Sequence, residues 1–288
     1  MPRPLLCLLT VFAALATGCG SEPPADANPP APPVATDKLA NFQPGTCGKI
    51  TGRVTWTGPV PDVGPIRNIQ PRPDGSGYDT REVTPPNAPR IDAFTRALGG
   101  AVVSLRGVDP ARAKPWDLPP VSVEIRDSQI LIAQGDRAPG RTGFVRRGEP
   151  VTMQSREPVF HSLRGRGAAF FALAFPDPDR PLTRTFDTYG RIELTNAAGF
   201  YWQAADLFVC DHPYYAVSDT DGRFQFAHVP EGKYDMVAWH PHWVTTATER
   251  SPESGLPFRL TYAPPLESSR PVAVVAGSTT LANLTLPK

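Results

Sequence analysis

The chain has 288 residues and a formal net charge of +1. This balance gives no electrostatic reason to expect nucleic acid or an anionic membrane surface as a partner. Its 24 glycines and 36 prolines make up about a fifth of the residues, a composition that disfavours long helices and favours short strands joined by turns.

The N-terminus has the features of a secretory signal. Arg3 is followed by an apolar run, residues 5–16, that is too short to span a bilayer. The next segment, Leu15-Ala16-Thr17-Gly18-Cys19, resembles a bacterial lipobox, although an ordinary signal peptide with an incidental cysteine is the alternative. The resemblance implies that residues 1–18 are removed and that Cys19 is lipidated. We therefore expect a protein anchored by its lipid to a membrane of the bacterial cell envelope, periplasmic or surface-exposed. Gly20 slightly favours the outer membrane.

Residues 19–46 are rich in Pro and Ala and nearly lack large apolar side chains. A segment of this kind cannot bury enough surface to fold, so we expect a flexible tether. Cys47 and Cys210 remain in the exported chain, where the environment is oxidising. We predict that they form a disulfide, with two separate thiols as the alternative.

The rest of the chain consists of short β-like runs separated by Gly- and Pro-containing turns, which is typical of an all-β sandwich. We expect residues 59–97 to be a loop with one helical turn at 91–98, and residues 250–269 to be a second loop. The predicted strands are, in chain order, 50–56, 101–105, 121–125, 130–132, 151–153, 168–175, 191–194, 207–209, 223–226, 234–239, 271–275 and 281–286.

Two C-terminal motifs resemble those of the carboxypeptidase-regulatory-like domain, an Ig-like or prealbumin-like β-sandwich. They are Ala216–Phe224 (AVSDTDGRF) and Val229–Tyr234 (VPEGKY). The resemblance extends to the strands around residues 50–54, 100–105 and 274–286, and implies a discontinuous sandwich made of residues 47–112 and 206–288. Asp219 and Asp221 are expected to shape a tight turn at Gly222 rather than a calcium loop.

The intervening residues, 113–205, resemble a cupredoxin-like Greek-key β-barrel. In one group of exported bacterial proteins, a cupredoxin domain stands directly before a segment similar to Asp211–Val217 (DHPYYAV). We therefore expect a cupredoxin-like insert between two strands of the discontinuous sandwich.

A type 1 copper site needs two histidines, a cysteine thiolate and usually a weak axial methionine. The resemblance places His161 at the first histidine position. It places Ala197, Phe200 and Gln203 at the positions of the cysteine, the second histidine and the methionine. None of these three can supply the required ligand, so we predict that no metal is bound there and that the protein has no cofactor. The segment Cys210–His212 is not the copper pair, because its spacing is one residue short.

A different site for copper or zinc is the alternative. His240 and His242 have the i, i+2 spacing that places two side chains on one face of a strand, and His161, His212 or Asp211 could complete such a site. Histidines that are solvated or hydrogen-bonded at a strand end explain the same pattern.

Two further surfaces are candidates for binding. Trp239 and Trp243 could contact sugar rings, or could serve only in packing. The stretch from Arg137 to Arg166 contains seven arginines and only two acids, which could form an anion-binding face for acidic glycans or a protein partner. A solvated surface is the alternative.

The sequence has none of the nucleophile, metalloprotease, phosphate-loop or dinucleotide motifs, and we expect the protein not to be an enzyme. The leading hypothesis is a binding or scaffolding protein with an unidentified protein or glycan ligand. Metal binding or electron transfer in the envelope, and carbohydrate binding by the sandwich, are the rival hypotheses.

Overall fold

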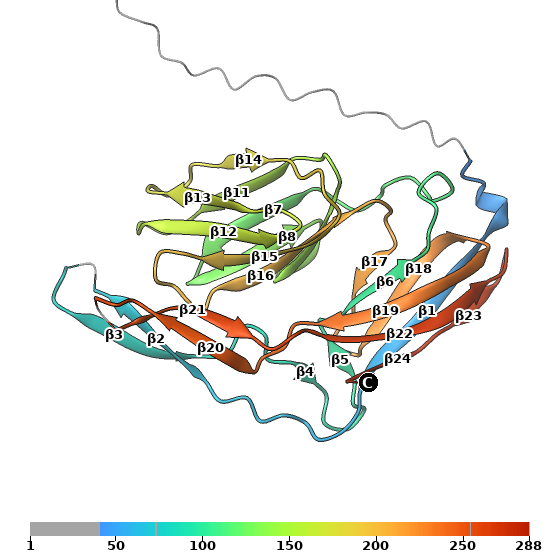
Figure 1. Ribbon diagram of the computed structural model, residues 1–288. Helices are drawn as coiled ribbons and strands as arrows, with labels where there is room; N and C mark the ends of the chain where they lie inside the picture. Colours follow the sequence, from blue (N-terminus) through green and yellow to red (C-terminus); the bar gives the residue numbers. More distant parts are fainter. Residues whose placement is uncertain (1–40, 73, 254, 288) are drawn as a thin grey trace, which may run out of the picture. The chain divides into compact units, whose positions relative to one another are not determined.

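The computed structural model describes residues 41–72, 74–253 and 255–287. The predicted signal peptide, Cys19 and most of the predicted tether therefore lie outside the described residues. The described chain is all-β, as predicted, and a single turn of 3-10 helix, η1 (Pro44–Thr46), precedes the first strand (Figure 1).

One β-sandwich is built from both ends of the described chain, and we call it the split sandwich. Its core unites apolar side chains from both of its sheets, among them Ile50, Leu105 and Phe226. The first sheet has the order β18 (Arg223–Pro230), β1 (Cys47–Trp56), β23 (Thr279–Leu281), with β24 (Leu284–Leu286) also paired to β1; the second has the order β17 (Tyr215–Val217), β6 (Val102–Arg106), β19 (Gly232–His240), β22 (Leu266–Val274).

A second β-sandwich lies between β6 and β17 in the sequence, and we call it the inserted sandwich. Residues from both of its sheets, such as Ile132 and Leu163, share one buried apolar cluster. The first sheet has the order β10 (Thr142–Arg146), β16 (Ala204–Cys210), β15 (Gly190–Asn196), β12 (His161–Gly167), β13 (Phe171–Phe175); the second has the order β14 (Leu182–Arg184), β11 (Val151–Ser155), β7 (Val121–Arg126), β8 (Gln129–Gln134), β9 (Arg137–Gly140).

Alternation of apolar and polar residues explains these strands. In β7 the buried residues are Val121, Val123 and Ile125, and the residues between them are partly exposed. Successive side chains of a strand point to opposite faces, so this pattern buries one face in the sandwich core. Every predicted strand coincides with an observed one, at least in part. The predicted boundary at residue 205 is wrong, however, because β16 runs from Ala204 to Cys210 and pairs only within the inserted sandwich.

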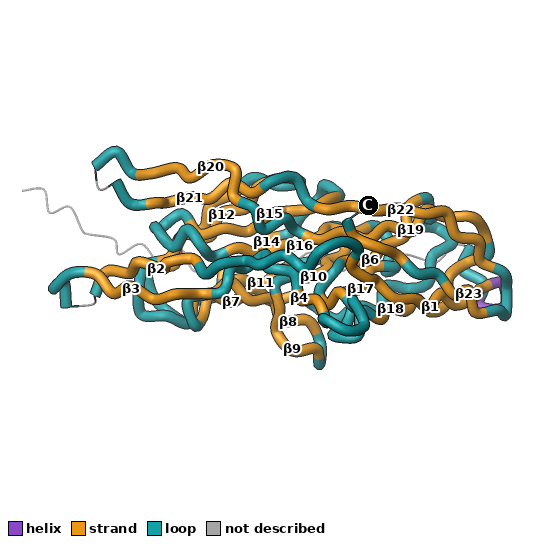
Figure 2. Tube along the Cα trace, turned by 90° about the horizontal axis from the view of Figure 1, so that it is seen from below, coloured by secondary structure: helices purple, strands orange, loops and turns teal. Residues whose placement is uncertain are grey.

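The two segments expected to be loops each contain a β-hairpin, so this expectation is wrong. One hairpin consists of β2 (Ile66–Pro71) and β3 (Tyr78–Val83), and the other of β20 (Thr245–Arg250) and β21 (Pro257–Tyr262). Their strands are largely exposed or only partly buried, so they lack the apolar alternation that reveals a half-buried strand. Figure 2 shows each hairpin as two neighbouring strands.

The helical turn predicted at 91–98 is also wrong. Residues of this segment form a short ladder between β4 (Arg90–Ile91) and β5 (Leu98–Gly99). The turn between them is held by Asp92, whose Oδ1 accepts hydrogen bonds from the backbone N–H groups of Phe94 (3.1 Å) and Thr95 (2.7 Å). An aspartate that caps a turn in this way competes with helix formation.

The turn at Gly222 forms as expected. Asp219 Oδ1 accepts hydrogen bonds from the backbone N–H groups of Asp221 (2.9 Å) and Arg223 (2.7 Å). Gly222 has φ +73°, and a Cβ at this position would lie 2.4 Å from the carbonyl oxygen of Val54. Both the backbone conformation and the close approach therefore require glycine.

The two sandwiches share a third apolar cluster, which contains Phe144 and Cys210 from the inserted sandwich and Trp239 from the split sandwich. A buried ion pair lies next to this joint. Arg191 Nε is 2.6 Å from Oδ1 of Asp206, and the guanidinium of Arg191 also lies over the ring of Trp239 at 5.0 Å. Burial raises the pKa of Asp206, although Arg191 opposes this effect. The joint thus combines apolar packing with a desolvated charge pair.

Candidate functional site

His161 is the first residue of β12 and is fully buried. Its Nε2 lies 2.7 Å from Oε2 of Glu157, and its Nδ1 lies 2.8 Å from Nδ2 of Asn196. An amide nitrogen can only donate, so Nδ1 accepts and Nε2 carries the proton that is donated to Glu157. Both ring nitrogens of His161 are therefore used within the protein.

Asn196 connects this histidine to the next polar side chain. It ends β15, where it occupies the inward-facing position that follows Ile192 and Leu194. Its Nδ2 also donates to Oε1 of Gln203 (2.9 Å), and its Oδ1 accepts from the backbone N–H of Ala198 (2.7 Å). Sequence reasoning missed Asn196, although an amide in an otherwise apolar inward row is a visible signal.

The three positions assigned to lost copper ligands surround His161. The ring of Phe200 lies 4.4 Å from the imidazole ring, measured between centroids. Ala197 donates its backbone N–H to the carbonyl of Ser162 (2.7 Å), next to the histidine in β12. Gln203 is 1% exposed and is linked to His161 through Asn196. Its Nε2 has no hydrogen-bond partner in the described part of the chain. A methyl, a phenyl and an amide group do not replace thiolate, imidazole and thioether ligands.

Glu157 links His161 to the β7–β8 hairpin. Its Oε1 accepts a hydrogen bond of 2.6 Å from the backbone N–H of Ser128, and Trp202 Nε1 donates to the carbonyl of the same residue at 3.0 Å. Burial alone would raise the pKa of Glu157, but the hydrogen bonds from His161 and Ser128 lower it below its usual value. The carboxylate is thus held ionised in contact with the Nε2–H of His161. We call Glu157, His161, Asn196, Phe200 and Gln203 the polar cluster.

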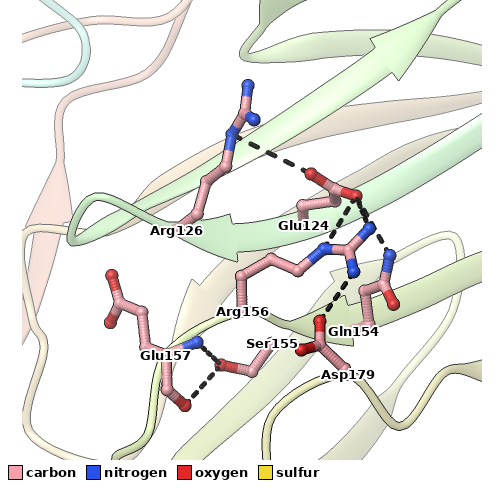
Figure 3. Close-up of polar contacts among 7 residues, drawn as sticks. All are labelled: Glu124, Arg126, Gln154, Ser155, Arg156, Glu157 and Asp179. Carbon is pink, nitrogen blue, oxygen red and sulfur yellow. Dashed lines mark hydrogen bonds and ion pairs between the residues drawn. The ribbon is translucent and has the colours of Figure 1, made fainter.

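An open hollow of about 730 Å³ lies beside Glu157. Within it, Arg156 donates to Oε1 of Glu124 (2.8 Å) and to Oδ1 of Asp179 (2.6 Å), and Arg126 Nε lies 3.9 Å from Oε2 of Glu124 (Figure 3). Burial would raise the pKa of Glu124, but Arg156 lowers it. Glu124 is therefore the acid of the hollow that its two arginines hold. Its lining residues are Glu124, Arg126, Asp127, Arg156, Glu157 and Pro158.

The predicted disulfide is contradicted, because Cys47 and Cys210 are both free, buried thiols. Cys47 begins β1 at the edge of the split sandwich, and its Sγ is 3.3 Å from the carbonyl of Gln43. Cys210 ends β16 within the shared apolar cluster, where its Sγ is 3.4 Å from the carbonyl of Phe208. Burial raises the pKa of both thiols.

The remaining histidines are not brought together with His161. Strand β19 ends at His240, so His242 lies beyond it and the predicted arrangement on one strand face is wrong. His240 Nδ1 donates to the carbonyl of Pro241 (2.7 Å), and His212 Nδ1 accepts from the backbone N–H of Tyr214 (3.3 Å). Within residues 41–287, as far as they are described, no group of three or more His, Cys, Asp or Glu residues is arranged to hold a metal ion.

The two tryptophans proposed as sugar contacts have different surroundings. Trp239 is only 7% exposed and is covered by Phe208 and Arg191, so its face is closed to a sugar. Trp243 is half-buried, stacks on His242 at 4.6 Å and contacts Trp56 at 5.6 Å, both measured between ring centroids. Packing therefore accounts for Trp239 and for much of Trp243.

Lipidation of Cys19 lies outside the described residues and stays a prediction. No helix in the described ranges is both long and apolar enough to cross a membrane.

No family model and no curated protein sequence matches the chain. Several solved copper proteins resemble part of it. An oxidised amicyanin mutant is 15% identical, with 32% of this chain and 82% of the amicyanin covered and a TM-score of 0.25. The copper-containing nitrite reductase of Thermus scotoductus SA-01 is 13% identical, with 34% and 24% covered and a TM-score of 0.27. A purple cupredoxin from Nitrosopumilus maritimus is 14% identical, with 31% and 98% covered and a TM-score of 0.24. Similarities with TM-scores this low do not assign the chain to a family.

Proposed function

We propose that the protein is a non-catalytic binding or scaffolding protein of a bacterial cell envelope, anchored by lipid at Cys19. In this proposal the inserted sandwich is a cupredoxin-like domain whose copper site has been replaced by the polar cluster. The single observation that carries the proposal is that His161 uses both ring nitrogens within the protein, in hydrogen bonds to Glu157 and Asn196.

The residues present do not fit type 1 copper. A copper ion would have to displace Asn196 from Nδ1 of His161 or Glu157 from Nε2, and each displaced group would be left buried without its partner. Leaving a buried polar group unsatisfied costs about 1–3 kcal/mol. The neighbouring positions Ala197, Phe200 and Gln203 offer no thiolate, imidazole or thioether in return.

Catalysis at the polar cluster is also disfavoured by burial. His161 is fully buried, and the hydroxyl of the nearby Ser155 is bonded to the backbone of Glu157 rather than to an imidazole. A nucleophile and its general base need to contact each other and the substrate. The surface hollow is lined by side chains of both charges, an arrangement that suits the docking of a partner.

The test is metal content. The purified protein is analysed for metals before and after loading with copper(II), copper(I) and zinc, and its thermal unfolding is followed in each case. We expect no stoichiometric metal and no shift of the unfolding midpoint. One tightly held metal per chain that is lost in His161→Asn but retained in His242→Asn would overturn the proposal, and the opposite pattern would identify the alternative histidine site.

Anchoring is tested separately by cell fractionation. The wild-type protein should be recovered with membranes, and Cys19→Ser should be recovered in the soluble fraction or as uncleaved precursor. Unchanged membrane association of a processed Cys19→Ser protein would refute lipidation at this residue.

A further inference from the structure

Strand β13 forms one end of a five-stranded sheet in the inserted sandwich. It pairs with β12 on one side, and within the described residues no strand pairs with its other side (Figure 1). An unpaired strand edge presents a row of backbone N–H and C=O groups that can pair with a further strand. The outer edge of β13 is therefore open to strand addition.

The sequence of this edge contains none of the residues that usually protect one. Natural sheets guard their edges with very short strands, charged side chains or proline. Residues 168–175 read AAFFALAF, an apolar run without charge, proline or glycine. Uncharged runs of this kind pair readily with other strands. Phe170, directly before β13, is also 78% exposed.

The other edge strands of the two sandwiches are protected, as far as the structure describes them. Four of them, β14, β17, β23 and β24, have only three residues each, and each of the longer ones, β9, β10, β18 and β22, contains an arginine. Strand β13 differs from all of these, because it has five residues and no charge. Its open edge is thus an exception within the same molecule.

The side chains of β13 fit a second copy of the same strand. Phe171 and Phe175 are buried in the core, whereas Leu173, on the same face, is only partly buried. Ala172 and Ala174 are exposed on the outer face. The sequence FALAF reads the same in both directions about Leu173.

This symmetry matters because antiparallel pairing reverses one of the two strands. A two-fold axis at Leu173 would place Phe171 opposite Phe175 of the second copy, and Ala172 opposite Ala174. The two Leu173 side chains would meet at the axis and cover each other. A two-fold interface uses the same surface on both copies, and this strand meets that condition by its sequence.

Charge does not oppose the pairing. Arg164 of β12 is the cross-strand neighbour of Ala172. In the paired arrangement the two β12 strands would lie three strand spacings apart, about 14 Å. This distance exceeds the Debye length of about 8 Å at physiological ionic strength, so repulsion between the two copies of Arg164 is largely screened.

We propose that the protein forms a dimer in which β13 pairs antiparallel with β13 of a second copy, around a two-fold axis at Leu173. The pairing joins the two five-stranded sheets into one continuous sheet and covers the exposed part of Leu173. It goes beyond the proposed function, because it depends on neither the polar cluster nor lipidation.

The test is sedimentation velocity of the purified protein carrying Cys19→Ser, so that lipid cannot cause association. A contact of five residues a side is smaller than the roughly 20–30 residues a side of a stable interface, so we expect a weak dimer. The mass should rise from one chain toward two between about 1 µM and about 200 µM. A monomer over the whole range, or association that continues beyond two chains, would contradict the dimer.

The decisive variants change the two exposed alanines and leave the core untouched. Ala172→Glu/Ala174→Glu and Ala172→Lys/Ala174→Lys each place like charges opposite one another, so each should self-associate about tenfold more weakly than the wild type. When the two variants are mixed, glutamates face lysines and a mixed dimer should form. Folded variants that fail to associate on mixing would overturn the pairing of these strands.

The matched control is Ala273→Glu/Val275→Glu, which adds the same charge to exposed positions in and just beyond edge strand β22. It should dimerise as the wild type does, and an equal loss in this control would refute a role of β13. If a charged variant does not fold, hydrogen exchange of the wild type decides. Backbone amides of residues 171–175 that face away from β12 should exchange at least about tenfold more slowly in the concentrated sample, and unchanged exchange would overturn the proposal.

Discussion

The two sandwiches satisfy their buried polar groups in different ways. In the split sandwich, the buried polar side chains of Ser218 and His240 bond to backbone: Ser218 Oγ donates to the carbonyl of Leu98, and His240 donates to that of Pro241. In the inserted sandwich, Glu157, His161 and Asn196 form a continuous chain of side-chain hydrogen bonds. A backbone partner is fixed by the strand, whereas a side-chain network holds only if every member is present.

This difference determines how far the effect of a single substitution spreads in each sandwich. A backbone-bonded histidine can be replaced with a local effect. The polar cluster depends on residues from β12, β15 and the segments next to them, so one change alters the surroundings of the others. Under the function proposed above, such a cluster is what would remain when the other ligand positions of a metal site are replaced and the first histidine still needs partners.

The largest expected effect comes from rebuilding the ligand set. The triple variant Ala197→Cys/Phe200→His/Gln203→Met would place a thiolate, an imidazole and a thioether around His161. We expect it to bind copper(II) and to gain the intense visible absorption of a copper thiolate site, and we expect no such absorption from the wild type. The measurement is a copper titration followed by visible spectroscopy.

The matched control is the same triple variant with His161→Asn, which should show no band. Absence of the band in a folded triple variant would contradict the assignment of these positions. A band that persists without His161 would show that the thiolate binds copper elsewhere.

The next effect concerns the joint between the sandwiches. Asp206→Asn removes the nearer of the two carboxylates beside Arg191 and leaves Glu193 at 3.5 Å; breaking a buried ion pair costs about 3 kcal/mol. We expect the free energy of unfolding from urea titration to fall by this amount. The control Asp221→Asn alters an exposed carboxylate of the split sandwich and should change the free energy of unfolding by less than about 0.5 kcal/mol. Equal effects of the two substitutions would contradict the buried pair.

The split sandwich should show a histidine-dependent response to pH. Burial lowers the pKa of His240 from 6.5 to about 4, so protonation favours the unfolded chain. The stabilisation from neutral His240 is complete above about pH 6.5 and is lost as the pH falls toward 4. Between pH 7 and pH 4.5 the loss amounts to about 2 kcal/mol. Urea titrations at both pH values should show this loss, and His240→Gln should show a smaller one.

His212 also has a pKa lowered by burial, so some dependence on pH should remain in His240→Gln. If the wild type and this variant lose the same free energy of unfolding between the two pH values, His240 is not responsible.

The sequence predicted much of the fold and less of the site. Alternating runs such as Val121–Ile125 identified the strands of both cores, because burial of one face imposes a period of two. The two hairpins were missed, because their exposed strands carry no such period. His161 was found through the spacing of a known ligand pattern, but Asn196 and Glu157 were not assigned to it. The amide of Asn196 stands out in its apolar row, but the partners of both residues depend on contacts between segments that no local pattern encodes.

The prediction of a disulfide between Cys47 and Cys210 failed for a related reason. Counting the cysteines of an exported chain gives a pairing only if the fold brings the two side chains together. Cys47 lies at an edge of the split sandwich and Cys210 lies in the joint with the inserted sandwich. The topology of the fold keeps the two thiols apart, and the cysteine count does not reveal that topology.

The smallest expected effect comes from a substitution in the polar cluster. Asn196→Ala removes the donor to Nδ1 of His161, the donor to Gln203 and the acceptor of the Ala198 N–H. Because these groups remain buried, we expect the free energy of unfolding to fall by about 2 kcal/mol. Asn196→Asp has nearly the same size. It keeps the Oδ1 that accepts from the Ala198 N–H and loses the Nδ2 that donates to His161 and Gln203.

If these side chains act as a network, His161→Gln added to Asn196→Ala should lower the free energy of unfolding by less than the sum of the two single substitutions. Additive losses in this double-mutant cycle would show that the two residues are independent, and the contrast with the split sandwich would then reduce to residue composition.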